Sequence, residues 1–211
     1  IMRVLVACEY SGTVRDSFIR AGHYAASCDI LPSESPLGDH YQCDIMDIID
    51  HGWDLMIAHP PCTFMSNAGA CRMYPQKGIV DPERLKKAMD AKEFFMKLLD
   101  APIPMICIEN PKPLNIVGLP PETQIIQPWM FGEPYTKKTL LWLKNLPPLI
   151  ETDVITEGIV PFCPSGTGRK LGGKSLGAAI RGNDSKNRSK FFKGMADAMA
   201  AQWGNLQKDI K

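Results

Sequence analysis

Residues 3–22 read RVLVACEYSGTVRDSFIRAG, and they give the first indication of the fold. The apolar run over residues 3–9 has the length and composition of a buried β-strand. A turn at Gly12 follows. Apolar residues then recur at helical spacing as far as the next glycine, which predicts a helix that Ser11 or Thr13 can cap. A strand that turns through a glycine into a helix is the first half of a βαβ unit, so we expect an α/β sheet.

The same alternation of strand and helix patterns continues along the chain. Further apolar runs typical of buried strands occupy residues 24–29, 55–58, 104–109 and 139–143. Asp81 followed by Pro82 is a favourable helix start, and the apolar spacing that follows predicts a helix that ends before Pro102. Apolar residues at helical spacing from Phe192 to Trp203 predict a C-terminal helix. We therefore expect a Rossmann-like sheet of parallel strands with helices on both faces.

Composition limits the classes of protein to consider. The chain has 211 residues, of which 45% are apolar and 22% charged, as in an ordinary globular domain. No apolar run approaches the roughly 20 residues that span a bilayer, so we expect a cytoplasmic protein without a membrane partner. Seven cysteines without regular spacing suggest reduced thiols. His59 and Cys62 lack a second pair of ligands at zinc spacing, so no metal centre is expected.

Charge is distributed unevenly along the chain. The net charge is +1, but the segment from Ser165 to Lys193 carries +7, which leaves −6 for the remainder. Such a basic, glycine-rich segment suits a polyanionic partner, and a solvated loop is the alternative. We expect its arginines and lysines to contact the backbone of a nucleic acid, in particular Arg181, Lys186 and Arg188.

Two acidic residues follow the glycine turn at the ends of short apolar segments. Asp29 ends the second predicted strand, and Asp44 precedes the run that begins at Ile45. Each alone is typical of a cap or a turn. Because ligands of such sheets bind beyond the carboxyl ends of the strands, the two acids together suggest an adenosine-containing cofactor. The spacing of a dinucleotide-binding fingerprint is absent.

A cysteine and a glutamate follow two further predicted strands. Cys62 comes after a double proline, on a stiff turn where a thiolate could act as a nucleophile. The alternative is that Cys62 is a small, buried and inert residue, as free cysteines usually are. Glu109 ends the next strand, and a carboxyl group that emerges from a buried strand can donate or share a proton. Together they form a more specific pair than either residue alone.

The order of these features resembles that of the DNA cytosine-5 methyltransferases. The matching positions are Tyr10-Ser11-Gly12, Asp29, Asp44, Pro61-Cys62, Glu109-Asn110 and residues 131–139, FGEPYTKKT. The resemblance covers roughly residues 3–143 and implies S-adenosylmethionine as cofactor, held by Tyr10, Ser11, Gly12, Asp29, Asp44 and Pro61. It implies that Cys62 adds to cytosine C6 and that Glu109 stabilises the proton at N3. Lys137 keeps a cation where the family has arginine, and Ser66 is expected at the nucleic acid.

Three departures from the family pattern define the alternatives. Val14 stands where the family has the second glycine of its first motif, and Pro111 stands where the family has valine after Glu-Asn. In place of the large target-recognition region of a full-size enzyme, this chain has only residues 144–190. We therefore expect one domain over residues 2–211, with 144–190 as a short, basic, loop-rich insertion, similar to compact methyltransferase-like proteins of phages and prophages. DNA is the expected substrate. The alternatives are RNA, a free pyrimidine nucleotide, or a non-catalytic protein that binds nucleic acid or nucleotides.

Overall fold

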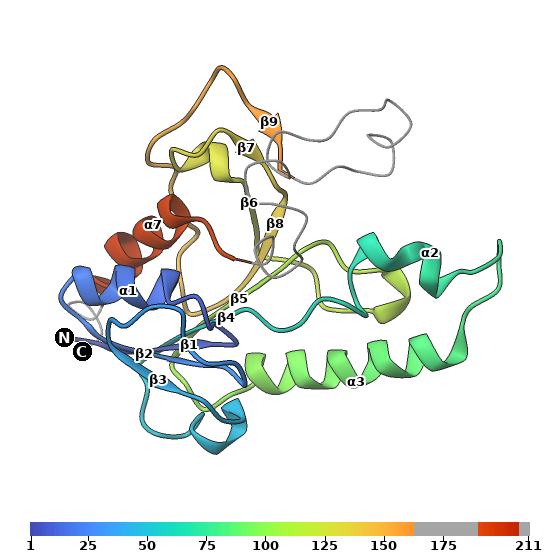
Figure 1. Cartoon of the computed structure of the whole chain (residues 1–211), viewed down its shortest axis with the longest axis horizontal. Coiled ribbons are helices and arrows are strands. Elements are labelled where there is room, and N and C mark those ends of the chain that lie inside the picture. The colour runs from blue at the N-terminus through green and yellow to red at the C-terminus, as the bar shows by residue number, and fades with distance from the viewer. Residues whose placement is uncertain (163–189, 207–211) are drawn as a thin grey trace.

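A computed structural model describes residues 1–162 and 190–206 (Figure 1). A seven-stranded sheet has the order β3-β2-β1-β4-β5-β8-β6. Its strands are β1 (Arg3–Ala7), β2 (Tyr24–Cys28), β3 (Asp39–Tyr41), β4 (Leu55–Ala58), β5 (Met105–Asn110), β6 (Gln124–Ile126) and β8 (Thr139–Lys144). The α-helices are α1 (Thr13–Arg20), α2 (Ala70–Met73), α3 (Pro82–Leu99) and α7 (Lys193–Trp203). Short 3-10 helices are η1 (Ile45–Asp47), η2 (Asn67–Gly69), η3 (Asn115–Val117) and η4 (Pro128–Met130).

Strand direction differs from the expectation at one edge of the sheet. Strands β3, β2, β1, β4 and β5 pair in parallel, as the sequence pattern predicts. Strand β8 instead runs antiparallel to both β5 and β6, so the prediction of parallel strands is wrong there. Strands β6 and β8 are joined without an α-helix, and parallel neighbours require a longer crossover, usually a helix. The result is a mixed, Rossmann-like α/β sheet.

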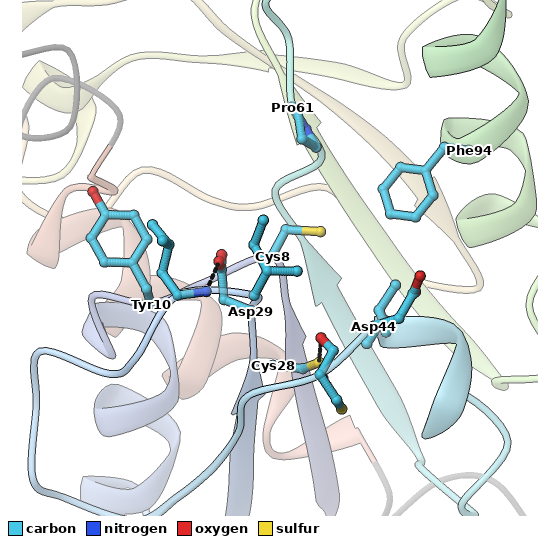
Figure 2. A pocket seen from close by; sticks show the side chains of 11 residues that line it. Cys8, Tyr10, Cys28, Asp29, Asp44, Pro61 and Phe94 are labelled. Atoms are coloured by element: carbon cyan, nitrogen blue, oxygen red, sulfur yellow. Dashed lines mark hydrogen bonds between the residues drawn. The ribbon is translucent and has the colours of Figure 1, made fainter.

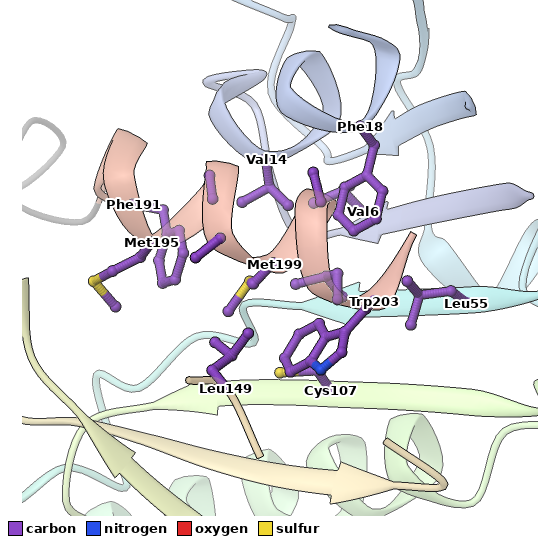
Figure 3. Close-up of a cluster of buried hydrophobic side chains, with 14 of the residues drawn as sticks. Val6, Val14, Phe18, Leu55, Cys107, Leu149, Phe191, Met195, Met199 and Trp203 are labelled. Carbon is purple, nitrogen blue, oxygen red and sulfur yellow. The ribbon is translucent and has the colours of Figure 1, made fainter. Parts of the chain in front are cut away.

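Alternate strand residues supply two separate cores, one on each face. Val4, Val6, Leu55 and Ile57 pack with α1 and α7, whereas Leu5, Ala7, Met56 and Ala58 pack with α3. Because side chains alternate across a strand, each apolar run covers both faces and needs helices on both. Figure 3 shows Phe18 of α1 and Met199 and Trp203 of α7 gathered over the strands. The prediction of helices on both faces is confirmed.

One close contact sets the position of α7. Gly194 lies against the carbonyl of Phe131, so near that a Cβ at Gly194 would come within 1.8 Å of that oxygen. At the other end of the helix, Trp203 is fully buried and its Nε1 donates a hydrogen bond to the Pro147 carbonyl at 2.9 Å. Because Gly194 has no side chain, α7 can approach residues 128–137 closely.

The order in which strands are added to the sheet reverses between β1 and β4, and this places the crevice. From β1 the chain builds β2 and β3 on one side, and then β4 and β5 on the other. Loops that leave adjacent parallel strands diverge at such a point, so ligands bind there, beyond the carboxyl ends. Cys8, Asp29 and His59 directly follow β1, β2 and β4.

The predicted insertion is described only in its first part. A two-stranded sheet pairs β7 (Tyr135–Thr136) with β9 (Val160–Pro161) in parallel. Residues 163–189, which include Arg181, Lys186 and Arg188, lie outside the described residues. In the ranges 1–162 and 190–206, no helix has the length and apolar character needed to cross a bilayer.

Candidate functional site

Two adjoining cavities lie at the carboxyl ends of β1, β2 and β4. The first has a volume of about 320 Å³, and Figure 2 shows the side chains that line it. The second has a volume of about 200 Å³. Four residues line both cavities, namely Cys8, Tyr10, Asp29 and Pro61. The first cavity is by itself large enough for a small-molecule site, for which roughly 300–1,000 Å³ is usual.

The predicted cofactor residues gather around these cavities. Tyr10, Asp29, Asp44 and Pro61 line the first, and Ser11 lines the second. Gly12 lines neither of these two cavities; it turns the chain into α1 with a φ of +76°, in the left-handed region that favours glycine. A Cβ there would also come within 2.7 Å of an Arg15 side-chain nitrogen.

The two aspartates each use a carboxylate oxygen to hold their own turn. Asp29 accepts a hydrogen bond from the Leu31 amide at 2.9 Å, and Asp44 caps η1 by accepting from the Met46 amide at 3.0 Å. A carboxylate has a second oxygen with which to accept a hydrogen bond from a ligand hydroxyl. The apolar side chains of Ile30, Leu31, Ile45 and Phe94 complete the first cavity. Carboxylates beside an apolar wall fit an adenosine-containing cofactor such as S-adenosylmethionine.

Glu9 caps α1, a role that the sequence argument gives to Ser11 or Thr13. Its carboxylate accepts hydrogen bonds from the Val14 amide at 2.7 Å and the Arg15 amide at 3.2 Å. The Ser11 hydroxyl accepts from the Thr13 amide at 3.3 Å and shares a hydrogen bond with the Thr13 hydroxyl at 3.1 Å. Burial raises the pKa of Glu9, although the charge of His59 and the helix amides oppose the shift. The carboxylate reaches α1 because Cys8, with φ +58°, turns the chain at the strand end.

Cys62 lies on the turn that follows β4, and hydrogen bonds hold this turn in place. The Cys62 carbonyl accepts from the amides of Met65 at 3.1 Å and Ser66 at 2.9 Å. The buried side chain of Asn110, on β5, donates to the Pro60 carbonyl at 2.8 Å. Burial raises the pKa of the Cys62 thiol, and the charge of Glu109 adds to this, whereas Lys137 and the Ser66 hydroxyl lower it. The resting thiol is therefore protonated.

Glu109 and Lys137 are electrostatic neighbours of that thiol. Burial would raise the pKa of Glu109, but the hydrogen bond and charge of His59, with the charge of Lys137, lower it overall. The Lys137 ammonium lies 5.5 and 5.4 Å from the ring centres of Phe162 and Phe192. Three separate parts of the chain thus bring Cys62, Glu109 and Lys137 into one electrostatic environment.

Two residues have surroundings that sequence reasoning did not anticipate. Ser66 is 6% exposed and its hydroxyl acts on the Cys62 thiol, and its contact with nucleic acid stays a prediction. His59, considered above only as a metal ligand, has its Nδ1 3.1 Å from the Glu109 carboxylate. The signal for His59 is its place directly after β4, in His59-Pro60-Pro61-Cys62. Within the described part of the chain, no group of three or more acidic, histidine or cysteine side chains could hold a metal ion.

Solved structures with a similar arrangement of elements include three methyltransferases. The Spodoptera frugiperda DNMT2, a mutant, is 17% identical at a TM-score of 0.38 over 74% of this chain and 55% of its own. The S. pombe Dnmt2 methyltransferase is 15% identical at 0.36 over 70% of this chain and 50% of its own. The Entamoeba histolytica methyltransferase EhMeth is 17% identical at a TM-score of 0.41 over 73% of this chain and 57% of its own.

The likeness is one of fold. The chain spans about half the length of these three proteins. No family model and no curated protein sequence matches it. We therefore base the functional assignment on the residues of the site and on their geometry.

Proposed function

We propose that the protein transfers a methyl group from S-adenosylmethionine to C5 of cytosine in DNA, through a covalent adduct of Cys62. The observation that carries the proposal is the shared electrostatic environment of Cys62, Glu109 and Lys137: Glu109 raises and Lys137 lowers the pKa of the Cys62 thiol, and Lys137 also lowers the pKa of Glu109. Cys62, Glu109 and Lys137 line neither of the two cavities, but Pro61, next to Cys62, lines both, and His59, whose Nδ1 is 3.1 Å from Glu109, lines the smaller one. Asp29 lines both cavities and Asp44 the larger, and we assign these two carboxylates to the adenosine part of the cofactor.

The chemistry explains why these residue types are needed together. Cytosine C5 is a poor nucleophile until a thiolate adds at C6. The Cys62 thiol gives its proton to solvent water and adds as the thiolate, and Glu109 holds the proton that N3 takes up. Lys137 favours the thiolate through its charge. The bound cofactor supplies a methyl group on a sulfonium. A base within a duplex must first be flipped out of the stack.

Labelled cofactor tests the proposal directly. The protein is incubated with S-adenosylmethionine labelled in its methyl group and with DNA, RNA or dCMP in parallel, and the labelled base is identified. We expect 5-methylcytosine in DNA. Label in RNA or dCMP alone would instead support the same scaffold acting on those substrates. Cofactor binding without any transfer would favour the non-catalytic binding protein.

Cys62→Ala separates the covalent mechanism from cofactor binding. We expect this variant to lose methyl transfer and to bind S-adenosylmethionine as the wild type does, because the thiol acts on the base. The matched control is Cys71→Ala, since Cys71 is exposed on α2. A Cys62→Ala variant with normal turnover would exclude the covalent adduct.

DNA binding by the basic segment is the second part of the proposal. Residues 144–190 stand where the family has its target-recognition region, and the charge of +7 over residues 165–193 supports contact with phosphates. Neutralising Arg181, Lys186 and Arg188 should weaken binding to all sequences about equally. It should also reduce the slope of log K against log salt by about 0.7–0.9 for each phosphate that the variant no longer neutralises. Equal affinities and slopes for variant and wild type would exclude this role.

A further inference from the structure

His59 lies between two acidic side chains from different elements. Its Nδ1 is 3.1 Å from the Glu109 carboxylate on β5, and the two side chains are only 13% and 15% exposed. On the other side, the charge of His59 acts on Glu9, which follows β1 and is 4% exposed. The imidazole therefore connects the wall of the smaller cavity, which His59 and Glu9 both line, with the environment of Cys62.

The second ring nitrogen of His59 has no hydrogen-bond partner in the part of the chain that the structure describes. Nε2 is buried and has no hydrogen-bond partner among the described residues, and the ring packs against Phe191 at a centroid distance of 5.0 Å. A histidine that only braces the fold normally has both ring nitrogens satisfied when buried. Here one nitrogen faces a carboxylate and the other has no bond that would fix the tautomer. The proton on this ring is therefore free to move toward Glu109.

Several charged or titratable groups lie in the surroundings of this His59–Glu109 pair. They are Glu109 on β5, Glu9 after β1, Cys62 after β4, Lys137 before β8 and Lys190 before α7. The charge of His59 lowers the pKa of Glu109 against the effect of burial. The Glu109 carboxyl group therefore holds no proton of its own at neutral pH, but its contact of 3.1 Å with Nδ1 of His59 is short enough for a proton to pass between the two. Alone at neutral pH, the same carboxylate would have to take that proton from solvent.

We propose that His59 is a positioning residue that shares one proton with Glu109, and that this pair delivers the proton to N3 of the pyrimidine. The inference rests on the proposed function. The Cys62 thiol gives its proton to solvent water, and as its sulfur bonds to C6 the electron pair of the C5–C6 double bond moves to C4–C5 and that of C4–N3 moves to N3. Glu109 passes the shared proton to N3, which leaves His59 as the neutral imidazole and Glu109 as the carboxylate. When C5 loses its proton to solvent water and the sulfur leaves as the thiolate, N3 returns its proton to the pair.

Tritium release from DNA tritiated at cytosine C5 tests this step without cofactor. Reversible addition of Cys62 makes C5 exchange its hydrogen with water, so exchange reports the protonation of N3. We expect His59→Asn, which keeps a hydrogen-bonding group near Glu109 but carries no mobile proton, to exchange about 10-fold or more slowly at pH 7.5. The deficit should shrink toward pH 5.5, where solvent can protonate Glu109. The matched control is His51→Asn, because the side chain of His51 is 53% exposed.

A second measurement separates proton sharing from catalysis. Carbon-13 NMR of the Glu109 carboxyl group should show its titration midpoint at higher pH in His59→Asn than in the wild type, because burial then acts without the opposing imidazole. An unchanged midpoint would overturn proton sharing. An exchange deficit of equal size at every pH, or none, would overturn the relay and leave the proposed function standing. A wild type that neither exchanges nor methylates any substrate would instead overturn the proposed function.

Discussion

Replacing Glu9 with glutamine tests how the turn before α1 is held. The Glu9 carboxylate accepts from two helix amides, at 2.7 Å from Val14 and 3.2 Å from Arg15, and from the Ser11 hydroxyl at 3.3 Å. Glutamine keeps one acceptor oxygen but places an NH₂ group where the second oxygen was. One of the two helix amides would then face a donor instead of an acceptor. The substitution therefore removes one capping hydrogen bond without creating a cavity.

The magnitude follows from two opposing effects. A hydrogen bond to a charged group contributes about 1.5–3 kcal/mol, and an acid at a helix N-terminus adds typically 0.3–1 kcal/mol. Burial acts against this, because it raises the pKa of Glu9 and so makes its ionised form costly in the folded state. We expect the free energy of unfolding to fall by about 1–2 kcal/mol at pH 7. The melting temperature should then fall by roughly 2–8 °C for a chain of this size.

The raised pKa of Glu9 also predicts in which direction the stability difference between the two proteins changes with pH. A carboxyl group whose pKa is raised on folding binds its proton more tightly in the folded state. Its contribution to stability is fully present below its ordinary pKa of about 4.5 and is lost as pH rises through the folded value. Glutamine does not titrate. The stability difference between wild type and Glu9→Gln should therefore be larger near pH 5 than at pH 7.

Urea unfolding of both proteins across this pH range measures the difference. The control is Asp50→Asn, which makes the same chemical change at a side chain that is 73% exposed, and it should stay within about 0.5 kcal/mol of the wild type. Equal stability of Glu9→Gln and wild type would refute the capping role. A difference that grows as pH rises would refute the argument that burial dominates the pKa.

Two further changes probe the cofactor site and the core. Asp29→Ala should weaken S-adenosylmethionine binding by about 1–3 kcal/mol in calorimetry, because the variant lacks a carboxylate that accepts ligand hydroxyls. DNA affinity should be unchanged, and unaltered cofactor affinity would show that Asp29 serves only its own turn. Gly194→Ala should lower the free energy of unfolding by about 3 kcal/mol, since its Cβ would meet the Phe131 carbonyl at 1.8 Å and α7 would have to move. Urea unfolding checks this, and wild-type stability would refute the close approach.

Local sequence patterns were sufficient for the main elements of the fold. The apolar run Leu55–Ala58 is β4 itself, and the helix expected between Asp81 and Pro102 is α3, capped by Asp81 through the Arg84 amide at 2.8 Å. Strand and helix periods, caps and proline stops act over a few residues, so they can be read directly from the sequence. The alternation of strand and helix also predicted where the carboxyl ends of the strands lie. Because ligands of such sheets bind beyond those ends, the general place of the cavities was predicted as well.

Relations between distant residues could not be read in this way. The antiparallel direction of β8, the proximity of His59 to Glu109 and the capping of α1 by Glu9 were all missed. His59 and Glu109 are 50 residues apart in sequence and meet because β4 and β5 pair in register, with Ala58 opposite Ile108. Periodicity places a side chain on a face of its own strand, but register and burial set its distance from a neighbour on another strand. The protonation of Cys62 and Glu109 depends on those distances and on the water that burial removes, and so it arises only in the folded protein.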